Sequence, residues 1–385
     1  MIKRDLSQKI KALAKQFPVV SLTGPRQSGK TTLVKNLFPK YTYLSLEDLD
    51  VRQRAEEDPR GFLNSFKKGV ILDEVQRVPH LFSYLQGVVD ASKKMGQFIL
   101  TGSQNFLLLE KISQSLAGRV AVMHLLPLGF NELSKDSKKK WKVNDILYGG
   151  LYPALYDRKL DVQTWHSSYI TTYLERDVRQ VKQVGDLNVF KKFMRLCAGR
   201  SGQLLNLSEL GNECGISHNT VKSWISILET SFIVFLLQPF HNNFNKRLVK
   251  QPKLYFYDTG VLCALLGINE ASQLQNHYYR GPIFETFVVS ELIKEAYHQG
   301  VRPQAYFWRD HRGNEIDYLK VKGDKLVPIE IKSGATVSSD YFKGLKYFKK
   351  LAEEQVKESF LIYGGEDSHT RKDGKVVSWR EIDEI

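Results

Sequence analysis

The sequence has few cysteines, no long apolar run and comparatively few acidic residues. Its three cysteines, Cys197, Cys214 and Cys263, are odd in number and far apart, so they predict neither a disulfide framework nor a zinc knuckle. The longest apolar run, Phe232–Leu237, is far shorter than the about 20 residues of a membrane-spanning helix. The first residues show no signal-peptide pattern. These absences exclude a disulfide-stapled secreted domain and a membrane protein, and they predict a reducing, cytoplasmic setting.

Basic residues outnumber acidic ones, with 56 lysines and arginines against 42 aspartates and glutamates in 385 residues. The resulting charge of +14 favours an anionic partner, and nucleic acid is the first candidate. Hydrophobic residues make up 42% of the chain, which is enough for packed cores, and the length predicts two or three domains. We therefore expect a folded protein of several domains with a nucleic-acid partner.

The N-terminal third alternates between short apolar runs and helical patterns. A strand-like run, 17–22, breaks at a Gly-Pro pair, and a helical pattern starts at Lys30. Two more apolar runs, 70–72 and 98–100, each end at polar residues, as buried strands do when their carboxyl ends line a site. This order predicts an α/β fold with a parallel sheet. The polar, basic stretch 134–140 suits a domain boundary, which we place at residue 140.

The segment Gly24–Thr31 matches the phosphate-loop pattern of Gly, four residues and Gly-Lys-Thr, between a predicted strand and a predicted helix. We expect the glycines to let backbone N–H groups surround phosphates, Lys30 to reach the β and γ phosphates, and Thr31 to complete a Mg²⁺ shell. The predicted cofactors are ATP and Mg²⁺. The predicted ATP-binding residues are Gly24, Pro25, Arg26, Gln27, Ser28, Gly29, Lys30, Thr31 and Thr32.

Two acidic residues, Asp73 and Glu74, follow the second apolar run. We expect Asp73 to serve as a metal ligand with Thr31, and Glu74 to act as the catalytic base that activates water. The third run ends at Ser103, the candidate for orienting that water, with Gln104 as the alternative. Arg119, on a small-residue turn, is a candidate charge clamp on the nucleotide of a neighbouring subunit; a solvated or structural arginine is the alternative.

The middle of the chain shows a helix-turn-helix pattern of the winged-helix type. Helical stripes in 207–214 and 217–229 are joined by Gly215, which permits a tight turn. The expected DNA contacts on the second helix are His218, Asn219, Lys222 and Ser223. The expected phosphate contacts that follow it are Lys246, Arg247, Lys250 and Lys253. A module that binds protein instead of DNA is the alternative.

The C-terminal part combines three acidic residues and one lysine. Glu285 lies on an amphipathic helix, and Asp317 follows in a strand-like run. In the strand 327–332, Glu330 and Lys332 share one face because the strand alternates. Glu285, Asp317 and Glu330 are candidate Mg²⁺ ligands, while Lys332 would orient or deprotonate water or stabilise a pentavalent phosphate. The alternatives are unrelated charges on a sheet face and a fold that has lost cleavage.

Two resemblances extend this interpretation. The runs 24–31, 72–76, 100–103, 116–119, 126–128, 149–153 and 169–179 resemble a prokaryotic AAA+-type ATPase family with an uncharacterised C-terminal region. That resemblance implies a homo-oligomer, a ring or stack such as a hexamer, with Arg119, or else Arg176 or Arg179, acting between subunits. Glu285, Asp317 and the Glu330-x-Lys332 pair resemble the site of the PD-(D/E)XK nuclease superfamily, which implies a restriction-endonuclease-like α/β domain.

We thus expect an ATPase core in 1–140, a helical lid and winged helix in 141–253, and a nuclease-like domain in 254–385. The expected function is that of a Mg²⁺-dependent ATPase that binds DNA and remodels it or controls its cleavage. The alternative is an ATP-driven switch or scaffold whose winged helix and inactive nuclease-like fold bind protein partners.

Overall fold

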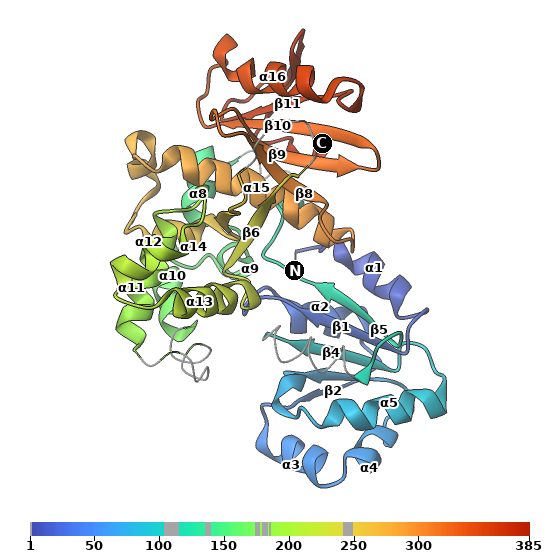
Figure 1. The fold of residues 1–385 in the computed structure, drawn as a ribbon. Helices are drawn as coiled ribbons and strands as arrows, with labels where there is room; N and C mark the ends of the chain where they lie inside the picture. The colour runs from blue at the N-terminus through green and yellow to red at the C-terminus, as the bar shows by residue number, and fades with distance from the viewer. Residues whose placement is uncertain are drawn as a thin grey trace. The chain divides into compact units, whose positions relative to one another are not determined.

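The computed structural model describes residues 2–103, 115–134, 140–173, 178, 184, 186–241 and 249–385 (Figure 1). The chain divides into two compact units. The first consists of Met1–Leu128, Thr230–Phe232 and Ala296–Val301, and the second of Gly129–Glu229, Ile233–Glu295 and Arg302–Ile385. Within the described ranges, no helix has the length and apolar character needed to cross a bilayer.

The first unit is built on a five-stranded parallel sheet in the order β2-β3-β4-β1-β5. Its strands are β1 (Val19–Thr23), β2 (Thr42–Ser45), β3 (Val70–Asp73), β4 (Phe98–Gly102) and β5 (Val120–His124). Its helices are α1 (Leu6–Leu13), α2 (Lys30–Leu37), α3 (Leu49–Glu57), α4 (Pro59–Asn64) and α5 (Leu81–Ser92), with a 3₁₀ turn at Val75–Arg77. This unit confirms the predicted α/β fold with a parallel sheet.

Both faces of this sheet are buried because its strands alternate between two apolar cores. Val19 of β1 packs into a core with Phe82 and Leu85 of α5. The next residue, Val20, packs into a second core with Leu33 of α2. Since β4 lies between β1 and β3, the carboxyl ends of these three strands are adjacent. Loops that follow neighbouring parallel strands are where α/β folds bind ligands.

The second unit begins with helices. They are α8 (Val143–Gly149), α9 (Pro153–Asp157), α10 (Val162–Tyr173), α11 (Leu187–Ala198), α12 (Leu207–Cys214), α13 (His218–Thr230) and α14 (Thr259–Leu265). Two later helices are α15 (Arg280–His298) and α16 (Lys343–Ala352). Short 3₁₀ turns lie at Phe130–Glu132, Ala271–Asn276, Ser339–Phe342, Glu353–Gln355 and Ile382–Glu384.

Helices α12 and α13 are joined by a short turn that begins at Gly215. The Asn206 side chain caps α12 by accepting a hydrogen bond from the Glu209 N–H at 3.2 Å. Gly215 ends α12 with a φ of +70°, a left-handed conformation that glycine adopts at little cost. In α13, the Trp224 ring packs edge-on against Phe190 and Phe193 of α11. These contacts bury one side of α13 and leave the other side for solvent.

The second unit also contains an eight-stranded sheet in the order β12-β13-β11-β10-β9-β8-β6-β7. The strands are β6 (Val234–Pro239), β7 (Lys253–Phe256), β8 (Ala305–Arg309), β9 (Glu315–Lys322), β10 (Lys325–Lys332), β11 (Phe360–Tyr363), β12 (His369–Arg371) and β13 (Gly374–Ser378). The β6–β7 hairpin joins this sheet because Gln238 pairs with Tyr306 of β8. The boundary expected at residue 253 therefore falls at the first residue of β7, inside one sheet.

Candidate functional site

The loop between β1 and α2 adopts a backbone that its glycines permit. Gly24 and Gly29 have φ angles of +151° and +93°. A side chain at Gly24 would collide with the Leu125 carbonyl, so glycine is required there. Gln27 also has a positive φ of +61°. The loop thus folds tightly in front of the amino end of α2, a position that suits an anionic phosphate.

Lys30 is buried at the first position of α2. Its ammonium group donates hydrogen bonds to the carbonyl oxygens of Gly24 at 3.0 Å and Pro25 at 2.8 Å. The Ser28 hydroxyl oxygen is also buried, without a hydrogen-bond partner in the described part of the chain. A charged amine held by neutral carbonyls and an unsatisfied hydroxyl fit a phosphate ligand.

Asp73 lies at the end of β3 and is 6% exposed. Its Oδ2 accepts hydrogen bonds from Thr31 Oγ1 at 2.7 Å and from the Tyr43 hydroxyl at 2.8 Å. Its Oδ1 accepts a short hydrogen bond from the Thr101 hydroxyl. Burial and the nearby Asp73 charge both raise the pKa of Tyr43, which keeps this phenol a donor. The two predicted metal-side residues, Thr31 and Asp73, are therefore in direct contact.

Glu74 follows in a left-handed conformation with a φ of +53°. Its Oε2 accepts hydrogen bonds from the Gln76 amide and from Ser103 Oγ, the latter at 3.2 Å. The structure thus brings together the predicted base and the predicted water-orienting hydroxyl. The alternative, Gln104, lies outside the described residues. Sequence reasoning missed Gln76, because its amide contacts Glu74 only once the turn between them has formed.

Arg4 is a second residue that the motifs did not indicate. It is 6% exposed, and its guanidinium donates to the carbonyl oxygens of Ser28 and Leu126, each at 2.8 Å. One side chain therefore ties the phosphate loop to the segment after β5.

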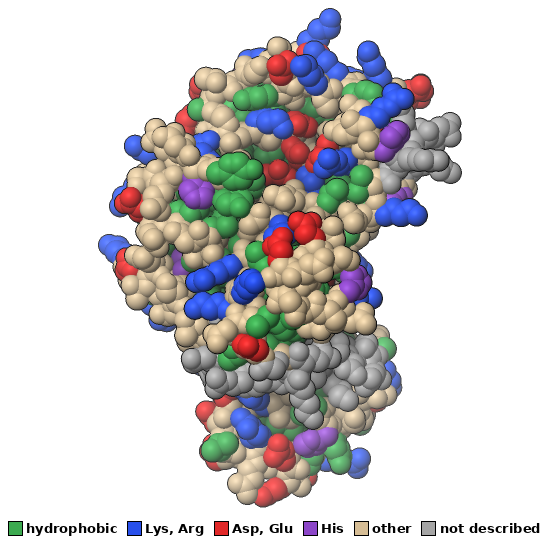
Figure 2. Space-filling view, turned by 60° about the vertical axis from the view of Figure 1, so that its left-hand side comes forward, with side chains coloured by type: hydrophobic (Ala, Val, Ile, Leu, Met, Phe, Trp, Pro, Cys, Tyr) green, Lys and Arg blue, Asp and Glu red, His purple; other side chains and the backbone are tan. Residues whose placement is uncertain are grey.

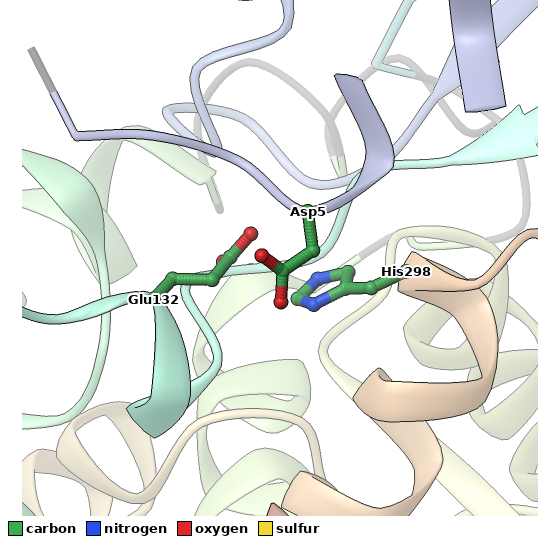
Figure 3. A group of neighbouring side chains, drawn as sticks. All are labelled: Asp5, Glu132 and His298. Atoms are coloured by element: carbon green, nitrogen blue, oxygen red, sulfur yellow. The ribbon is translucent and has the colours of Figure 1, made fainter. Parts of the chain in front are cut away.

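The residue after Arg4, Asp5, has a carboxylate oxygen within 4.8 Å of a ring nitrogen of His298, another residue of the first unit (Figure 3).

The second unit contains an open pocket of about 550 Å³ that is rich in charged side chains. It unites the four residues expected from the sequence: Glu285 of α15, Asp317 of β9, and Glu330 and Lys332 of β10. Figure 2 shows acidic and basic side chains gathered closely on one face. The lining residues are Gly202, Gln203, Leu204, Lys253, Glu285, Arg309, Glu315, Asp317, Glu330 and Lys332.

Lys332 links the two strand carboxylates. Its Nζ lies 2.5 Å from Glu330 Oε1 and 3.7 Å from Asp317 Oδ2. Asp317 Oδ2 also accepts a hydrogen bond from the Ile331 N–H at 2.8 Å. The other oxygen of Glu330, Oε2, is buried without a hydrogen-bond partner in the described ranges. An unsatisfied buried carboxylate oxygen is costly unless a ligand such as a cation completes it.

The charges of the pocket perturb one another. Burial, and then the neighbouring Asp317, raise the pKa of Glu330 to about 8. Burial alone would lower the pKa of Lys332, but the negative charges of Asp317 and Glu330 outweigh it and raise the pKa. Lys332 is therefore an ammonium ion at neutral pH, suited to stabilising negative charge. Strongly perturbed groups in a pocket are typical of functional sites.

Further residues that were not predicted at this pocket bind its helix carboxylate or line it, among them Lys253, Glu315 and Tyr255. Lys253 Nζ lies 3.1 Å from Glu285 Oε1 and also contacts Glu315 closely. The Tyr255 hydroxyl donates to the same Glu285 oxygen at 2.6 Å. We expected Lys253 to contact DNA phosphates, but it is only 3% exposed and bound to two carboxylates. It belongs to the pocket instead, since its side chain turns inward from β7.

The lysines separate the carboxylates of the pocket. Among the residues that the structure describes, no three of these acidic groups bring oxygen atoms within 4.8 Å of one another. Lys332 lies between Asp317 and Glu330, and Lys253 contacts both Glu285 and Glu315. The oxygen donors suit Mg²⁺ or Mn²⁺ in kind. Binding such an ion at Asp317 and Glu330 requires the Lys332 ammonium to move aside.

Comparison with known proteins gives the family. Over 370 residues the chain is 31% identical to an uncharacterized protein of Mycobacterium tuberculosis, covering 94% of this chain and 80% of the other. The chain belongs to the family of this mycobacterial protein. It is also 23% identical over 348 residues to an uncharacterized protein of Haemophilus influenzae, covering 80% of this chain and 81% of that one.

Three domain families account for most of the chain. Residues 16–134 match the AAA domain family, residues 140–272 match a domain of unknown function, DUF8612, and residues 280–382 match another, DUF4143. A Walker-type ATPase of Pyrococcus abyssi superposes with a TM-score of 0.48 and 12% identity, covering 69% of this chain and 96% of that chain. The AAA match spans β1 to β5 and the phosphate loop, so the first unit is an AAA-type P-loop ATPase domain.

Within the AAA domain, Arg119 lies away from the phosphate loop. It immediately precedes β5, and its carbonyl pairs with the Val19 N–H at the amino end of β1. Its guanidinium donates to both oxygens of Asp90, at 2.5 and 2.9 Å. The amino ends of parallel strands are opposite the nucleotide of the same subunit, so a role on a neighbouring subunit stays a prediction. Arg176 and Arg179 lie outside the described residues.

The expected DNA-contacting side chains of α13 lie on its outer side. His218, Asn219 and Lys222 are exposed, and Ser223 is half-buried. Lys250 is exposed as well. The other two expected phosphate contacts, Lys246 and Arg247, lie outside the described residues. The accessible set is compatible with an anionic ligand, and DNA binding stays a prediction.

Proposed function

We propose that this AAA-family protein is a Mg²⁺-dependent ATPase that binds DNA and controls DNA cleavage at the pocket of its second unit. The observation that supports the proposal best is the convergence of Glu285, Asp317, Glu330 and Lys332 in one open pocket. These residues come from one helix and two strands, and they supply oxygen ligands beside an ammonium ion. That combination suits phosphodiester hydrolysis.

In the ATPase site, each residue has a distinct task. Lys30 neutralises the β and γ phosphates, and Thr31 and Asp73 would hold Mg²⁺, which supplies further neutralisation of the phosphates. Glu74 accepts a proton from the attacking water, while Ser103 holds the Glu74 carboxylate in place at 3.2 Å. Arg4 keeps the loop in shape through the Ser28 and Leu126 carbonyls.

In the pocket, Asp317 and Glu330 would hold a divalent cation, which polarises the scissile phosphate when it is bound. Water attacks the phosphorus atom and gives up a proton to the solvent, the bond from phosphorus to the leaving oxygen breaks, and that oxygen takes a proton from solvent. Lys332, held as an ammonium ion, stabilises the charge of the pentavalent phosphate. The arrangement resembles the PD-(D/E)XK site, and the exposed side of α13 with Lys250 offers a DNA-binding surface.

The test measures ATP hydrolysis and strand breaks in the same tubes, with duplex, single-stranded and four-way-branched DNA. We expect one DNA form to stimulate hydrolysis and to acquire breaks. Asp317→Asn should abolish the breaks, whereas Asp324→Asn, which changes an exposed aspartate of the β9–β10 turn, should not. Breaks that persist in Asp317→Asn would show that another site, or a contaminant, produces them.

A second function is favoured by one observation: Glu285, the helix carboxylate, is already neutralised by Lys253. In this alternative the pocket cuts nothing, and the protein is an ATP-driven switch that binds a protein partner. The same assay separates the two functions. A hydrolysis rate that is flat across all DNA forms, with no breaks, would support the switch.

A further inference from the structure

The pocket contains two lysines, and they differ in how tightly they are held. We propose that Lys253 is a built-in counter-ion that occupies the place of a second metal ion, so that the pocket takes a single divalent cation, at Asp317 and Glu330. The inference rests on the proposed metal site and specifies its stoichiometry. The pocket would then bind one divalent cation and no second one.

The first support is the position of the Lys253 ammonium group. It lies 3.1 Å from Glu285 Oε1 and in close contact with Glu315 Oε1. Two-metal nucleases place their ions about 3.5–4 Å apart, each between carboxylate oxygens. Here one such carboxylate pair already has a cation between its members, and that cation is part of the chain.

The second support is the difference in burial between the two lysines. The Lys253 side chain is 4% exposed, while the Lys332 side chain is 34% exposed. Lys332 can turn from Asp317 and Glu330 toward the open side of the pocket when an ion approaches, where it still faces a bound phosphate. Lys253 cannot leave in this way, because its side chain is enclosed and its ammonium group is held by Glu285 and Glu315.

The third support is the charge of the pocket. With all four carboxyl groups ionised, as they are once a cation binds and displaces the Glu330 proton, they face two lysines and one arginine, which leaves a formal charge of −1 before the charge of the cation is counted. One divalent cation reverses that charge, and the anionic phosphate of a substrate then restores balance. A second divalent cation would leave a large positive excess in a partly buried site, which is unfavourable. Replacing Lys253 by a neutral residue removes one positive charge and frees Glu285 Oε1 and Glu315 Oε1 for an ion, while Arg309 keeps its contact with Glu315 Oε2.

The test counts Mn²⁺ ions by titration calorimetry and by electron paramagnetic resonance of free Mn²⁺, without nucleotide. Every variant carries Asp73→Asn, so that the ATPase site adds nothing to the count. We expect one Mn²⁺ in the parent and two in Lys253→Met, which keeps the length of the side chain. Lys250→Met, an exposed lysine of the same segment, should still bind one.

A second measurement is thermal unfolding, which is monitored by tryptophan fluorescence. All five tryptophans, Trp141, Trp165, Trp224, Trp308 and Trp379, lie in the second unit, so the signal reports on the pocket's own unit. Mn²⁺ should raise the midpoint of Lys253→Met more than that of the parent. Lys253→Gln provides a second neutral variant if the methionine variant does not fold, and it should also bind two ions.

The outcomes separate the two proposals. One ion in both parent and Lys253→Met would overturn the counter-ion role and leave the site at Asp317 and Glu330 intact. No ion in the parent but one in Lys253→Met would overturn the proposed metal site and support the role of Lys253. Two ions in the parent pocket would overturn the single-ion requirement directly.

Discussion

The phosphate loop and the carboxylate pocket each contain a buried lysine, and the two lysines have opposite partners. Lys30 donates to two neutral carbonyl oxygens, whereas Lys253 contacts two carboxylates. A lysine that donates to carbonyl oxygens can exchange these hydrogen bonds for bonds to an incoming anion such as a phosphate. A lysine on carboxylates is neutralised, and it contributes stability and selectivity instead of ligand affinity. The partners of a buried lysine therefore indicate its role better than its burial does.

The two sites also differ in how far apart their residues are in the chain. The Lys30 ammonium bonds to carbonyls five and six residues away, within one loop. Lys253 and its partner Glu285 are 32 residues apart and lie on a strand and a helix. The loop is thus a local structure with a sequence pattern of its own, and the pocket depends on the folding of the second unit.

The largest effect should come from the catalytic base of the local site. Glu74→Gln should lower ATP turnover by about 10²–10⁴-fold, because the amide accepts no proton, while nucleotide binding persists. Lys30→Met should instead prevent nucleotide binding. Turnover is measured by phosphate release and binding by a fluorescent ATP analogue. The matched control is Glu56→Gln, on the exposed side of α3. Normal turnover in Glu74→Gln would refute its assignment as the base.

The pocket should respond to mutation mainly through stability. Lys253→Met leaves the partly buried Glu285 without its lysine and Glu315 with only Arg309 as a cationic partner. Breaking a fully buried ion pair costs about 3–5 kcal/mol, so we expect a loss of unfolding free energy near the lower end of that range. We expect the second unit to unfold at a lower urea concentration, as followed by tryptophan fluorescence. Lys250→Met should unfold like the parent. If Lys253→Met unfolded at the parent's midpoint, the two carboxylates would have another source of compensation, and the contrast with Lys30 would lose its basis.

The residues of the ATPase site are close together in the chain and those of the pocket are far apart, and this difference explains what could be predicted from the sequence. The spacing Gly24 to Thr31 and the acids after 70–72 predicted the ATPase site because strand, loop and helix follow directly in the chain. The alternation of β10 placed Glu330 beside Lys332 for the same reason. Nothing local indicated that Lys253 turns inward from β7, or that β6 pairs with β8. Both depend on long-range sheet pairing, which a single sequence does not encode in a short pattern.

Arg4 is a residue of the ATPase site that the sequence did not predict, because its contacts are also far away in the chain. Its two strongest hydrogen bonds, to Ser28 and Leu126, span 24 and 122 residues. Arg4→Gln should weaken ATP binding by about tenfold, because hydrogen bonds from a charged donor contribute about 1.5–3 kcal/mol, part of which shapes the loop. The dissociation constant of a fluorescent ATP analogue measures this effect. Arg60→Gln, which changes an exposed residue of α4, should bind ATP normally. An unchanged constant in Arg4→Gln would mean that the glycines alone hold the loop.

The smallest effect should be the pH dependence of stability that comes from His124. This buried side chain is uncharged in the folded state, in contrast to the paired charges of the pocket. Its ring packs near Phe232 and Tyr297, and its Nδ1 lies 2.7 Å from Thr23 Oγ1. Burial lowers the pKa of His124 to about 4, so the folded state keeps the ring neutral. The unfolded chain takes up a proton near pH 6.5. Stability from this group is therefore present above about pH 6.5 and is lost as the pH falls toward 4.

When the pH falls from 7.5 to 5.5, the preferential protonation of His124 in the unfolded chain lowers the free energy of unfolding by about 1 kcal/mol. His124→Asn keeps a polar atom near Thr23 but does not titrate, so the difference in melting temperature between parent and variant should shrink as the pH falls. Calorimetry is the measurement here, because the AAA domain contains no tryptophan. A difference that stays constant over this range would mean that His124 takes up its proton at the same pH in the folded and the unfolded chain. A buried charge in the AAA domain would then need a partner, as it does in the pocket.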